Sequence, residues 1–144
     1  MQLKEIMTRN VEVIHPNATL EEAAAKMDDL NVGPLPVCDG RRLVGIVTDR
    51  DIVVRAISAG QDPKSTRVRD VMTSDVVYEF EDQDVREATR RMKEDQIRRL
   101  VVLDSDKNLV GIVSLGDLAV DSGDDGLSGD VLEGVSSPAE PDRS

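Results

Sequence analysis

Gly45-Ile46-Val47-Thr48-Asp49-Arg50-Asp51 returns later in the chain as Gly111-Ile112-Val113-Ser114-Leu115-Gly116-Asp117. The repetition extends further, because Met7-Thr8 returns as Met72-Thr73 at an offset of 65 residues. The offset becomes 66 after the segment 104–109, so the second copy carries one inserted residue there. A repeat of this length indicates one supersecondary unit that is built twice and packed against itself. Any site in one copy is therefore expected to have a counterpart in the other.

The composition allows one compact aliphatic core. With 144 residues the chain is long enough to bury a core, and 39% of its residues are apolar. Tyr78 and Phe80 are the only aromatic residues, so Val, Leu, Ile, Ala and Met must fill the interior. Such a core favours β-branched strands packed against small helices.

The chain is strongly acidic, with a formal net charge of −11. Residues 121–144 contribute −6 of this charge, because they hold seven acidic residues and one base, Arg143. Direct nucleic-acid binding requires a basic face, so the charge argues against it. The amino terminus has no apolar signal-like region, and no stretch approaches the length of a membrane span. We therefore expect a soluble cytoplasmic protein that binds neither nucleic acid nor membrane.

Both copies predict the same order of elements. Thr19 and Asp84 each lie three residues before a glutamate and mark the start of a helix. A second, closing helix is expected directly after Thr48 and directly after Ser114. The predicted extended segments are 11–14, 35–38 and 43–47 in the first copy and 76–78, 100–103 and 109–113 in the second.

The repeat also predicts the domains. We expect the first repeat at residues 1–60, a linker at 61–66 and the second repeat at residues 67–120. Residues 121–144 are dominated by Gly, Ser, Asp, Glu and Pro, and they can bury too little apolar surface to fold alone. We expect this acidic tail to be disordered or loosely docked.

The junction between the last strand and the closing helix carries polar groups in both copies. Thr48 or Ser114 stands at the helix start, where free N–H groups and the helix dipole favour an anion. Asp51 or Asp117 follows three residues later, and its carboxylate could accept hydrogen bonds from two sugar hydroxyls. With an aliphatic slot for a base, these groups describe a nucleotide pocket. The alternative is that they only cap the helix, which is the more frequent arrangement for either copy alone.

With these features the chain resembles the cystathionine-β-synthase (CBS) domain family. The two Gly-Ile-Val-Thr/Ser stretches look like the family signature, and the Met-Thr pair ahead of each also matches. The segments 32–37 and 97–102 match as well, so the resemblance covers about residues 3–120. The stand-alone layout and the run 48–53 are similar to small bacterial CBS-pair proteins of the hypoxic-response type.

The resemblance implies an α/β (α+β) fold. Each copy would form a β-α-β-β-α unit, and the two units would pair with pseudo-two-fold symmetry into a Bateman module with two clefts between the repeats. Modules of this family usually associate into a disc-like homodimer. The clefts of many members bind AMP, ADP, ATP or S-adenosylmethionine, so an adenosine compound is the expected regulatory ligand, and no cofactor is required.

The resemblance also implies roles for single residues. Asp51 and Asp117 would hold ribose hydroxyls, and Thr48 and Ser114 would lie near the phosphate or the ribose. Backbone and aliphatic side chains would enclose the base around Val11, Val13, Ile46, Val76, Val77 and Ile112.

The two copies differ around the expected sites. Arg98 and Arg99 replace a Gly-Pro pair of the first copy, and an arginine fork there could pair with phosphates. Solvation, or pairing with acidic neighbours, is equally compatible with so acidic a chain. The first closing helix starts with Asp-Arg at 49–50, whereas the second starts with Leu-Gly at 115–116. We therefore expect the two clefts to differ in affinity.

Two other side chains stand alone in the sequence. His15 is the only histidine and precedes Pro16 in a predicted loop, and Cys38 is the only cysteine, at the end of a predicted strand. We expect His15 to face solvent and Cys38 to be a buried, inert thiol, with an intermolecular contact of Cys38 as the alternative. Neither a metal cluster nor a nucleophile with a general base is indicated.

Three classes of function follow from these features. The first is a non-enzymatic regulatory module that binds an adenosine compound and signals to a partner protein by shifting the arrangement of its two units. The second is a dimeric scaffold that uses the same fold without a ligand. The third, an enzyme, finds no catalytic groups in the sequence.

Overall fold

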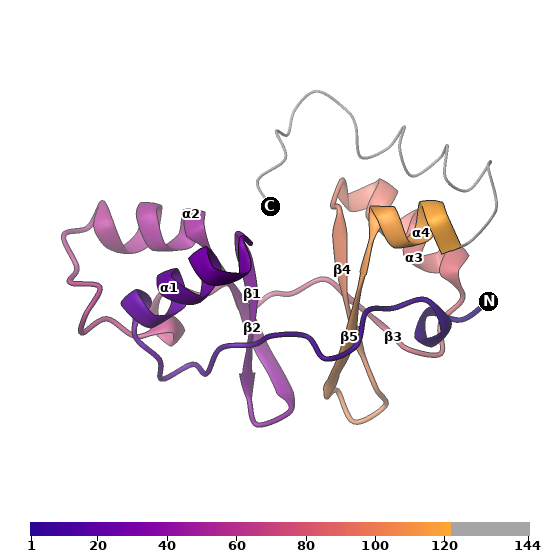
Figure 1. Cartoon of the computed structure of the whole chain (residues 1–144), viewed down its shortest axis with the longest axis horizontal. Coiled ribbons are helices and arrows are strands. Elements are labelled where there is room, and N and C mark those ends of the chain that lie inside the picture. Colours follow the sequence, from indigo (N-terminus) through magenta and orange to yellow (C-terminus); the bar gives the residue numbers. More distant parts are fainter. Residues whose placement is uncertain (122–144) are drawn as a thin grey trace. The chain divides into compact units, whose positions relative to one another are not determined.

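The computed structural model describes the backbone of residues 1–121 and the side chains of residues 1–118. The described chain forms two compact units (Figure 1). One unit is formed by residues 12–76 (the 12–76 unit), and the other combines residues 1–11 with residues 77–121 (the 77–121 unit). Each contains strands and helices, so the expected mixed α/β fold is confirmed. The predicted acidic tail lies, beyond its first residue, outside the described residues.

The 12–76 unit starts its first helix, α1 (Leu20–Leu30), with the predicted capping box. The Thr19 hydroxyl accepts from the Glu22 amide at 3.2 Å, and the Glu22 carboxylate accepts from the Thr19 amide at 3.4 Å. The antiparallel strands β1 (Pro34–Asp39) and β2 (Arg42–Thr48) follow α1. The remaining elements of the unit are α2 (Asp49–Asp51), its π-helical continuation (Ile52–Ile57) and a 3₁₀ turn (Val68–Asp70).

The 77–121 unit repeats this plan with one more strand. Strand β3 (Tyr78–Phe80) lies parallel to β4 (Arg99–Leu103), and β4 pairs antiparallel with β5 (Leu109–Ser114). Strand β3 starts two residues later than the predicted segment 76–78 and pairs with β4 from Val101 onward. The elements are a 3₁₀ turn (Leu3–Glu5), β3 (Tyr78–Phe80), α3 (Val85–Asp95), β4 (Arg99–Leu103), β5 (Leu109–Ser114) and α4 (Leu115–Asp121).

The first residues of each repeat, here called its lead-in segment, pack into the unit that contains most of the other repeat. Leu3 and Met7, at the start of the chain, are buried in the core of the 77–121 unit. Val68 and Val71, ahead of the second repeat, are buried in the core of the 12–76 unit. The compact units therefore combine parts of both repeats, and the domain boundaries expected from the sequence stay a prediction about the repeats.

This exchange explains the glycines that stand at the same place in β2 and β5. A Cβ atom on Gly45 would lie 2.8 Å from the carbonyl oxygen of Thr73. A Cβ atom on Gly111 would lie 2.9 Å from the carbonyl oxygen of Thr8. Each glycine thus permits the close approach of a lead-in backbone, which is a common use of glycine within a strand.

The edge of the sheet differs between the units, and the predicted strand at 11–14 is wrong. Only Ile14 forms a single bridge beside β1. At the equivalent place Glu79 is the centre of β3, and the Glu81 amide continues the ladder by donating to β4 at 2.8 Å. Pro16 stands at the position equivalent to Glu81 and has no N–H to donate, so the first ladder stops.

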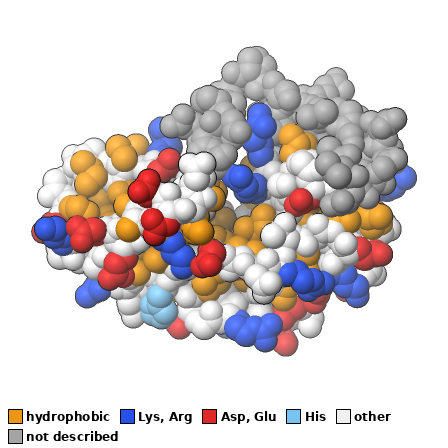
Figure 2. All heavy atoms as spheres, in the orientation of Figure 1, with side chains coloured by type: hydrophobic (Ala, Val, Ile, Leu, Met, Phe, Trp, Pro, Cys, Tyr) orange, Lys and Arg blue, Asp and Glu red, His pale blue; other side chains and the backbone are white. Residues whose placement is uncertain are grey.

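One helical face of the 12–76 unit leaves apolar side chains in solvent. Val53, Val54 and Ile57 are 58%, 47% and 48% exposed. Figure 2 shows hydrophobic side chains at the surface over the helix labelled α2 in Figure 1 and its continuation. Ile52 and Ala56 of the same helix are buried in the core. Among the described residues, this helix and every other one is too short or too polar to cross a membrane.

Candidate functional site

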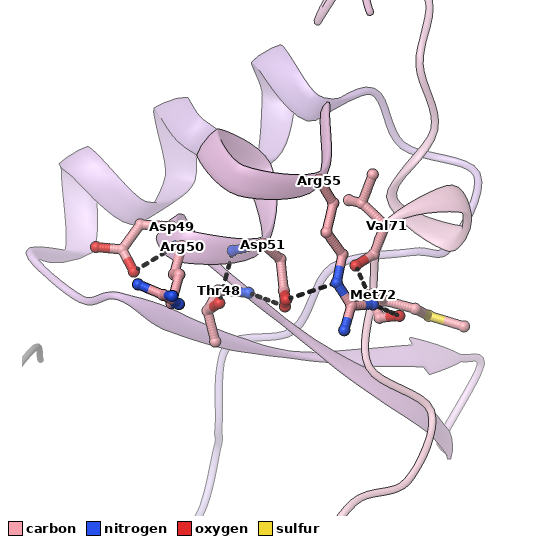
Figure 3. Close-up of polar contacts among 7 residues, drawn as sticks. All are labelled: Thr48, Asp49, Arg50, Asp51, Arg55, Val71 and Met72. Carbon is pink, nitrogen blue, oxygen red and sulfur yellow. Dashed lines mark hydrogen bonds and ion pairs between the residues drawn. The ribbon is translucent and has the colours of Figure 1, made fainter. Parts of the chain in front are cut away.

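The first strand–helix junction closes with a reciprocal pair of hydrogen bonds (Figure 3). The Thr48 hydroxyl oxygen accepts from the Asp51 amide at 3.0 Å, and Oδ2 of Asp51 accepts from the Thr48 amide at 3.0 Å. This is the geometry of a capping box. The helix cap, which the sequence offered as the alternative to a nucleotide pocket, is therefore formed. The carboxylate keeps acceptor capacity on its other oxygen, Oδ1.

The second junction has the same geometry. Oδ2 of Asp117 accepts from the Ser114 amide at 2.9 Å, and the Ser114 hydroxyl accepts from the Asp117 amide at 3.1 Å. Both side chains are half-buried. Within the described part of the chain, the Asp117 carboxylate makes no further hydrogen bond or ion pair. The structure thus brings hydroxyl and carboxylate together in both copies, as the sequence predicted.

The backbone amides at the two helix starts are used differently. The Asp49 amide donates at 3.1 Å to the carbonyl before β1, and the Leu115 amide donates at 2.9 Å to the carbonyl before β4. In the first junction the Asp49 carboxylate also accepts from the Arg50 amide at 2.9 Å. The equivalent amide of Gly116 has no such acceptor among the described residues. The second helix start therefore offers an amide that the first does not.

A residue that the sequence analysis missed, Arg55, lies against the first carboxylate. Its Nε is 3.6 Å from Oδ1 of Asp51, and its Nη1 donates to the carbonyl oxygens of Val71 and Met72 at 3.3 and 3.4 Å (Figure 3). The i,i+4 spacing from Asp51 to Arg55 on a helix was the available signal. In the second repeat the equivalent position holds Asp121, so this arginine has no counterpart there.

The residues expected around a base are distributed over both units. Ile46 exchanges two backbone hydrogen bonds with Thr73, at 2.9 and 2.8 Å, and Ile112 does the same with Thr8, at 2.8 and 3.0 Å. Their backbone groups therefore hold the lead-in segments, and parts of their side chains stay accessible. The half-buried set is Val11, Val13, Ile46, Val76, Val77 and Ile112.

The two arginines before and at the start of β4 are available to an anion. Arg98 is half-buried and Arg99 is exposed. Within the described residues, neither guanidinium makes a hydrogen bond or an ion pair, so neither is paired with the acidic neighbours considered above. Their planar forks could therefore bind phosphate oxygens without first breaking another contact.

The lone cysteine is buried, whereas the lone histidine side chain is half-exposed. Cys38 is 3% exposed, so the expected burial of this thiol is confirmed, and burial raises its pKa to about 11. The His15 side chain is half-exposed, with Nε2 at 3.6 Å from Oδ1 of Asp39 and Nδ1 accepting from the Asn17 amide at 3.0 Å. Across residues 1–118, no group of three His, Cys, Asp or Glu side chains is placed to bind a metal ion.

A further polar depression of about 340 Å³ lies on α3 and β3. Its charges pair with one another, since Arg91 donates to the Glu79 carboxylate at 3.2 Å and Arg90 donates to Glu87. Gln83 donates to the second Glu79 oxygen at 3.4 Å. The network satisfies the buried Glu79 carboxylate in the sheet edge. The lining residues are Glu79, Gln83, Glu87, Arg90, Arg91, Glu94 and Asp95.

Similar proteins of known sequence span nearly the whole chain. A CBS domain-containing protein of Bacillus subtilis, YhcV, is 40% identical over 134 residues, which are 93% of this chain and 94% of the relative. Hypoxic response protein 1 of Mycobacterium tuberculosis is 36% identical over 117 residues, 81% of each chain. The crystal structure of Hypoxic Response Protein I with two coordinated zinc ions has a TM-score of 0.74 and covers 83% of this chain and 97% of that one.

Two similar structures contain adenosine compounds. CBSX2 in complex with AMP has a TM-score of 0.72 at 27% identity, covering 84% of this chain and 95% of that one. The CBS domain pair of MJ0100, in complex with 5′-methylthioadenosine and S-adenosylmethionine, has a TM-score of 0.69 at 28% identity, covering 85% and 96%.

The CBS domain family model matches this chain twice, at residues 3–57 and 68–121. The two matches coincide with the two copies of the repeat and with the helix–strand–strand–helix order of the structure. Because the model accounts for most of the chain and the relatives span its length, this protein belongs to the CBS domain family as a tandem pair.

Proposed function

We propose that this protein is a non-enzymatic regulatory module that binds an adenosine-containing ligand, AMP, ADP, ATP or S-adenosylmethionine. Asp51 and Asp117 bind the ribose hydroxyls, and Thr48 and Ser114 lie near the phosphate or the ribose. One observation carries the proposal. Both units present the same hydroxyl–carboxylate pair in the same geometry, in a family whose solved members include complexes with AMP and S-adenosylmethionine.

The surrounding residues supply the other parts of such a ligand site. Half-buried aliphatic side chains, among them Val13, Ile46, Val77 and Ile112, enclose the base. Arg98 and Arg99 bind the phosphates, which is supported by the absence of other partners for their guanidinium groups among the described residues. The ligand acts by favouring one arrangement of the units over another, in proportion to its affinity for each.

The output of the module goes to another protein in the cytoplasm, and the module itself is a homodimer. The exposed apolar side chains of Val53, Val54 and Ile57 support a contact with a second copy. Such side chains are costly to leave in water, and burial against the same face of another chain would remove that cost.

Titration calorimetry with AMP, ATP and S-adenosylmethionine tests ligand binding. We expect heat from at least one of them, and a roughly ten-fold loss of affinity at one site in Asp51→Asn and at the other in Asp117→Asn. Asparagine keeps a side-chain oxygen that can accept a hydrogen bond from the Thr48 or Ser114 amide, so the cap is retained while the charge is lost.

The matched control is Asp84→Asn, which changes the capping carboxylate at the start of α3 and leaves both junctions intact. Unchanged affinity in both junction variants would contradict the ribose assignment. No heat from any of the three compounds with the folded protein would contradict ligand binding altogether.

A ligand-free dimeric scaffold is the second candidate, because the capping boxes account for both junctions without a ligand. Both candidate functions predict a dimer, but only the regulatory module predicts heat in the calorimetric titrations. The double variant Val54→Lys/Ile57→Lys should shift the protein toward monomer in sedimentation velocity experiments. Val44→Lys would not serve as its control, because Val44 packs on the core. Arg50→Lys, which is exposed on the same helix and keeps its charge, is the control.

A further inference from the structure

We propose that Arg55 weakens the first ligand site by holding the Asp51 carboxylate, so that the Ser114–Asp117 junction binds the ribose of the ligand more tightly. This inference rests on the proposed function, because it presumes that the carboxylates bind ribose hydroxyls. It goes further by naming the residue that makes the two sites unequal.

Arg55 is held against the carboxylate from two directions. Its Nε lies 3.6 Å from Oδ1 of Asp51, the carboxylate oxygen that takes no part in the capping box. Its Nη1 is shared between the carbonyl oxygens of Val71 and Met72, at 3.3 and 3.4 Å (Figure 3). Since these carbonyls belong to the backbone of the same unit, they keep the guanidinium close to Asp51 even though the arginine side chain is 54% exposed.

The second junction lacks every part of this arrangement. Oδ1 of Asp117 has no partner among the described residues, and the sequence places Asp121 where the first repeat has Arg55. A second carboxylate, Asp49, covers the Arg50 amide of the first junction, whereas Leu115 at the equivalent place carries no charge. The missing arginine contact and the uncharged Leu115 both favour a ribose diol at the second junction.

The cost to the first site follows from competition for one carboxylate. A ribose diol donates two hydrogen bonds, and in the bidentate arrangement a carboxylate accepts one of them on each oxygen. At Asp51 one oxygen already accepts from the Thr48 amide and the other faces Arg55. A hydroxyl that binds Oδ1 competes there with the Arg55 guanidinium, so the affinity falls by the free energy of the contact that is weakened. For a partly exposed ion pair this corresponds to a factor of about two to five.

Calorimetry with adenosine isolates this effect, because adenosine has the ribose diol and no phosphate that Arg50 or Arg55 could attract. In the Asp117→Asn background only the first site retains its carboxylate, and we expect Arg55→Gln to lower its Kd about two- to five-fold. Arg50→Gln in the same background is the matched control, since it removes a charge from the same helix without touching Asp51. With 2′-deoxyadenosine, which lacks one hydroxyl, the gain from Arg55→Gln should disappear.

A ligand-free measurement tests the contact itself. In two-dimensional spectra of the arginine Nε–H groups, the Arg55 signal should shift in Asp51→Asn and stay in place in Asp117→Asn. An Arg55 signal that ignores Asp51→Asn overturns the inference. An unchanged or weakened first site in Arg55→Gln, with adenosine still bound, also overturns it and leaves the proposed function standing. No adenosine heat from the wild type or any variant overturns both.

Discussion

The two strand–helix junctions are built alike and differ in what surrounds them. Thr48 with Asp51, and Ser114 with Asp117, form reciprocal hydrogen bonds of nearly the same lengths. Around the first pair the chain places Arg55 against the free carboxylate oxygen, whereas the second carboxylate has no such neighbour among the described residues. Conserved local geometry and divergent surroundings are what a duplicated module would need for two binding sites of unequal strength.

The same contrast runs through the rest of the two units. Both hold a lead-in backbone against a strand glycine, and both start their first helix with a side-chain cap. They differ at the sheet edge, where Ile14 of one unit corresponds to Glu79 of the other. The comparison suggests that backbone contacts limit what the repeats can change, while side chains at the edges are free to diverge. Three stability measurements test this view.

The largest effect is expected for alanine at the shared glycines. Gly111→Ala puts a Cβ 2.9 Å from the Thr8 carbonyl oxygen, and Gly45→Ala puts one 2.8 Å from the Thr73 carbonyl oxygen. Because a backbone oxygen cannot rotate away, each should lower the free energy of unfolding by about 3 kcal/mol in urea titrations.

The control for the glycine variants is Gly116→Ala, whose nearest neighbour would be the Ser114 hydroxyl at 3.7 Å. It should be neutral or stabilising by up to about 1 kcal/mol, because alanine favours a helix over glycine. If one of the two strand glycines tolerates alanine and the other does not, the units do not use their glycines for the same purpose.

A smaller effect is expected from the pH dependence of Cys38, which stands where the other unit has Leu103. Burial raises the pKa of this thiol from 9.0 to about 11. Between these values the unfolded thiol ionises while the folded thiol stays protonated, so stability falls as the pH rises from 9 to 11. The loss should reach about 2 kcal/mol.

Urea unfolding at pH 8 and pH 11 measures this loss, and Cys38→Ala isolates it from the titration of other groups. The wild type should lose more stability than the variant over this interval. Equal losses in the two proteins would show that the thiol ionises as readily in the folded state as in the unfolded state.

The smallest effect is expected at the sheet edge. Arg91→Met leaves the Glu79 carboxylate, which is 10% exposed, with Gln83 as its remaining partner, and should cost about 1 kcal/mol after allowing for solvent at Arg91. Lys26 is the equivalent residue in the other unit. It lies 3.3 Å from the exposed Glu12 carboxylate and donates to the Val13 carbonyl oxygen. Neither partner is a buried acid, so Lys26→Met should cost less than Arg91→Met, about 0.5 kcal/mol.

Glu79→Ile in the Arg91→Met background converts this edge to the apolar form of the first unit. Urea titrations should then recover the stability that Arg91→Met lost, because no buried charge is left unpaired. A double variant that is less stable than Arg91→Met would mean that Glu79 contributes to the fold through more than its ion pair.

Much of the fold could be predicted from the sequence because its signals are local. The capping box at Thr19 marked the start of α1, and the predicted segments 35–38 and 43–47 lie within the paired strands β1 and β2. The failure at 11–14 had a non-local cause, since the missing donor of Pro16 matters only once β1 lies beside Ile14. The exchange of lead-in segments was also invisible, because a repeat in sequence carries no information on which copy its first residues join.

The candidate site divides in the same way. Hydroxyl and carboxylate three residues apart are brought together by a single helical turn, so the sequence by itself determined both pairs and the family to which they belong. Only the tertiary structure decided the use of the glycines and the position of Arg55. Gly45 and Arg55 meet carbonyl oxygens of the segment 71–73, and Gly111 meets the carbonyl oxygen of Thr8. These carbonyls are distant in sequence and reach their partners only through packing. Local hydrogen bonds are encoded by spacing, whereas contacts between segments are selected by the close packing of the whole unit.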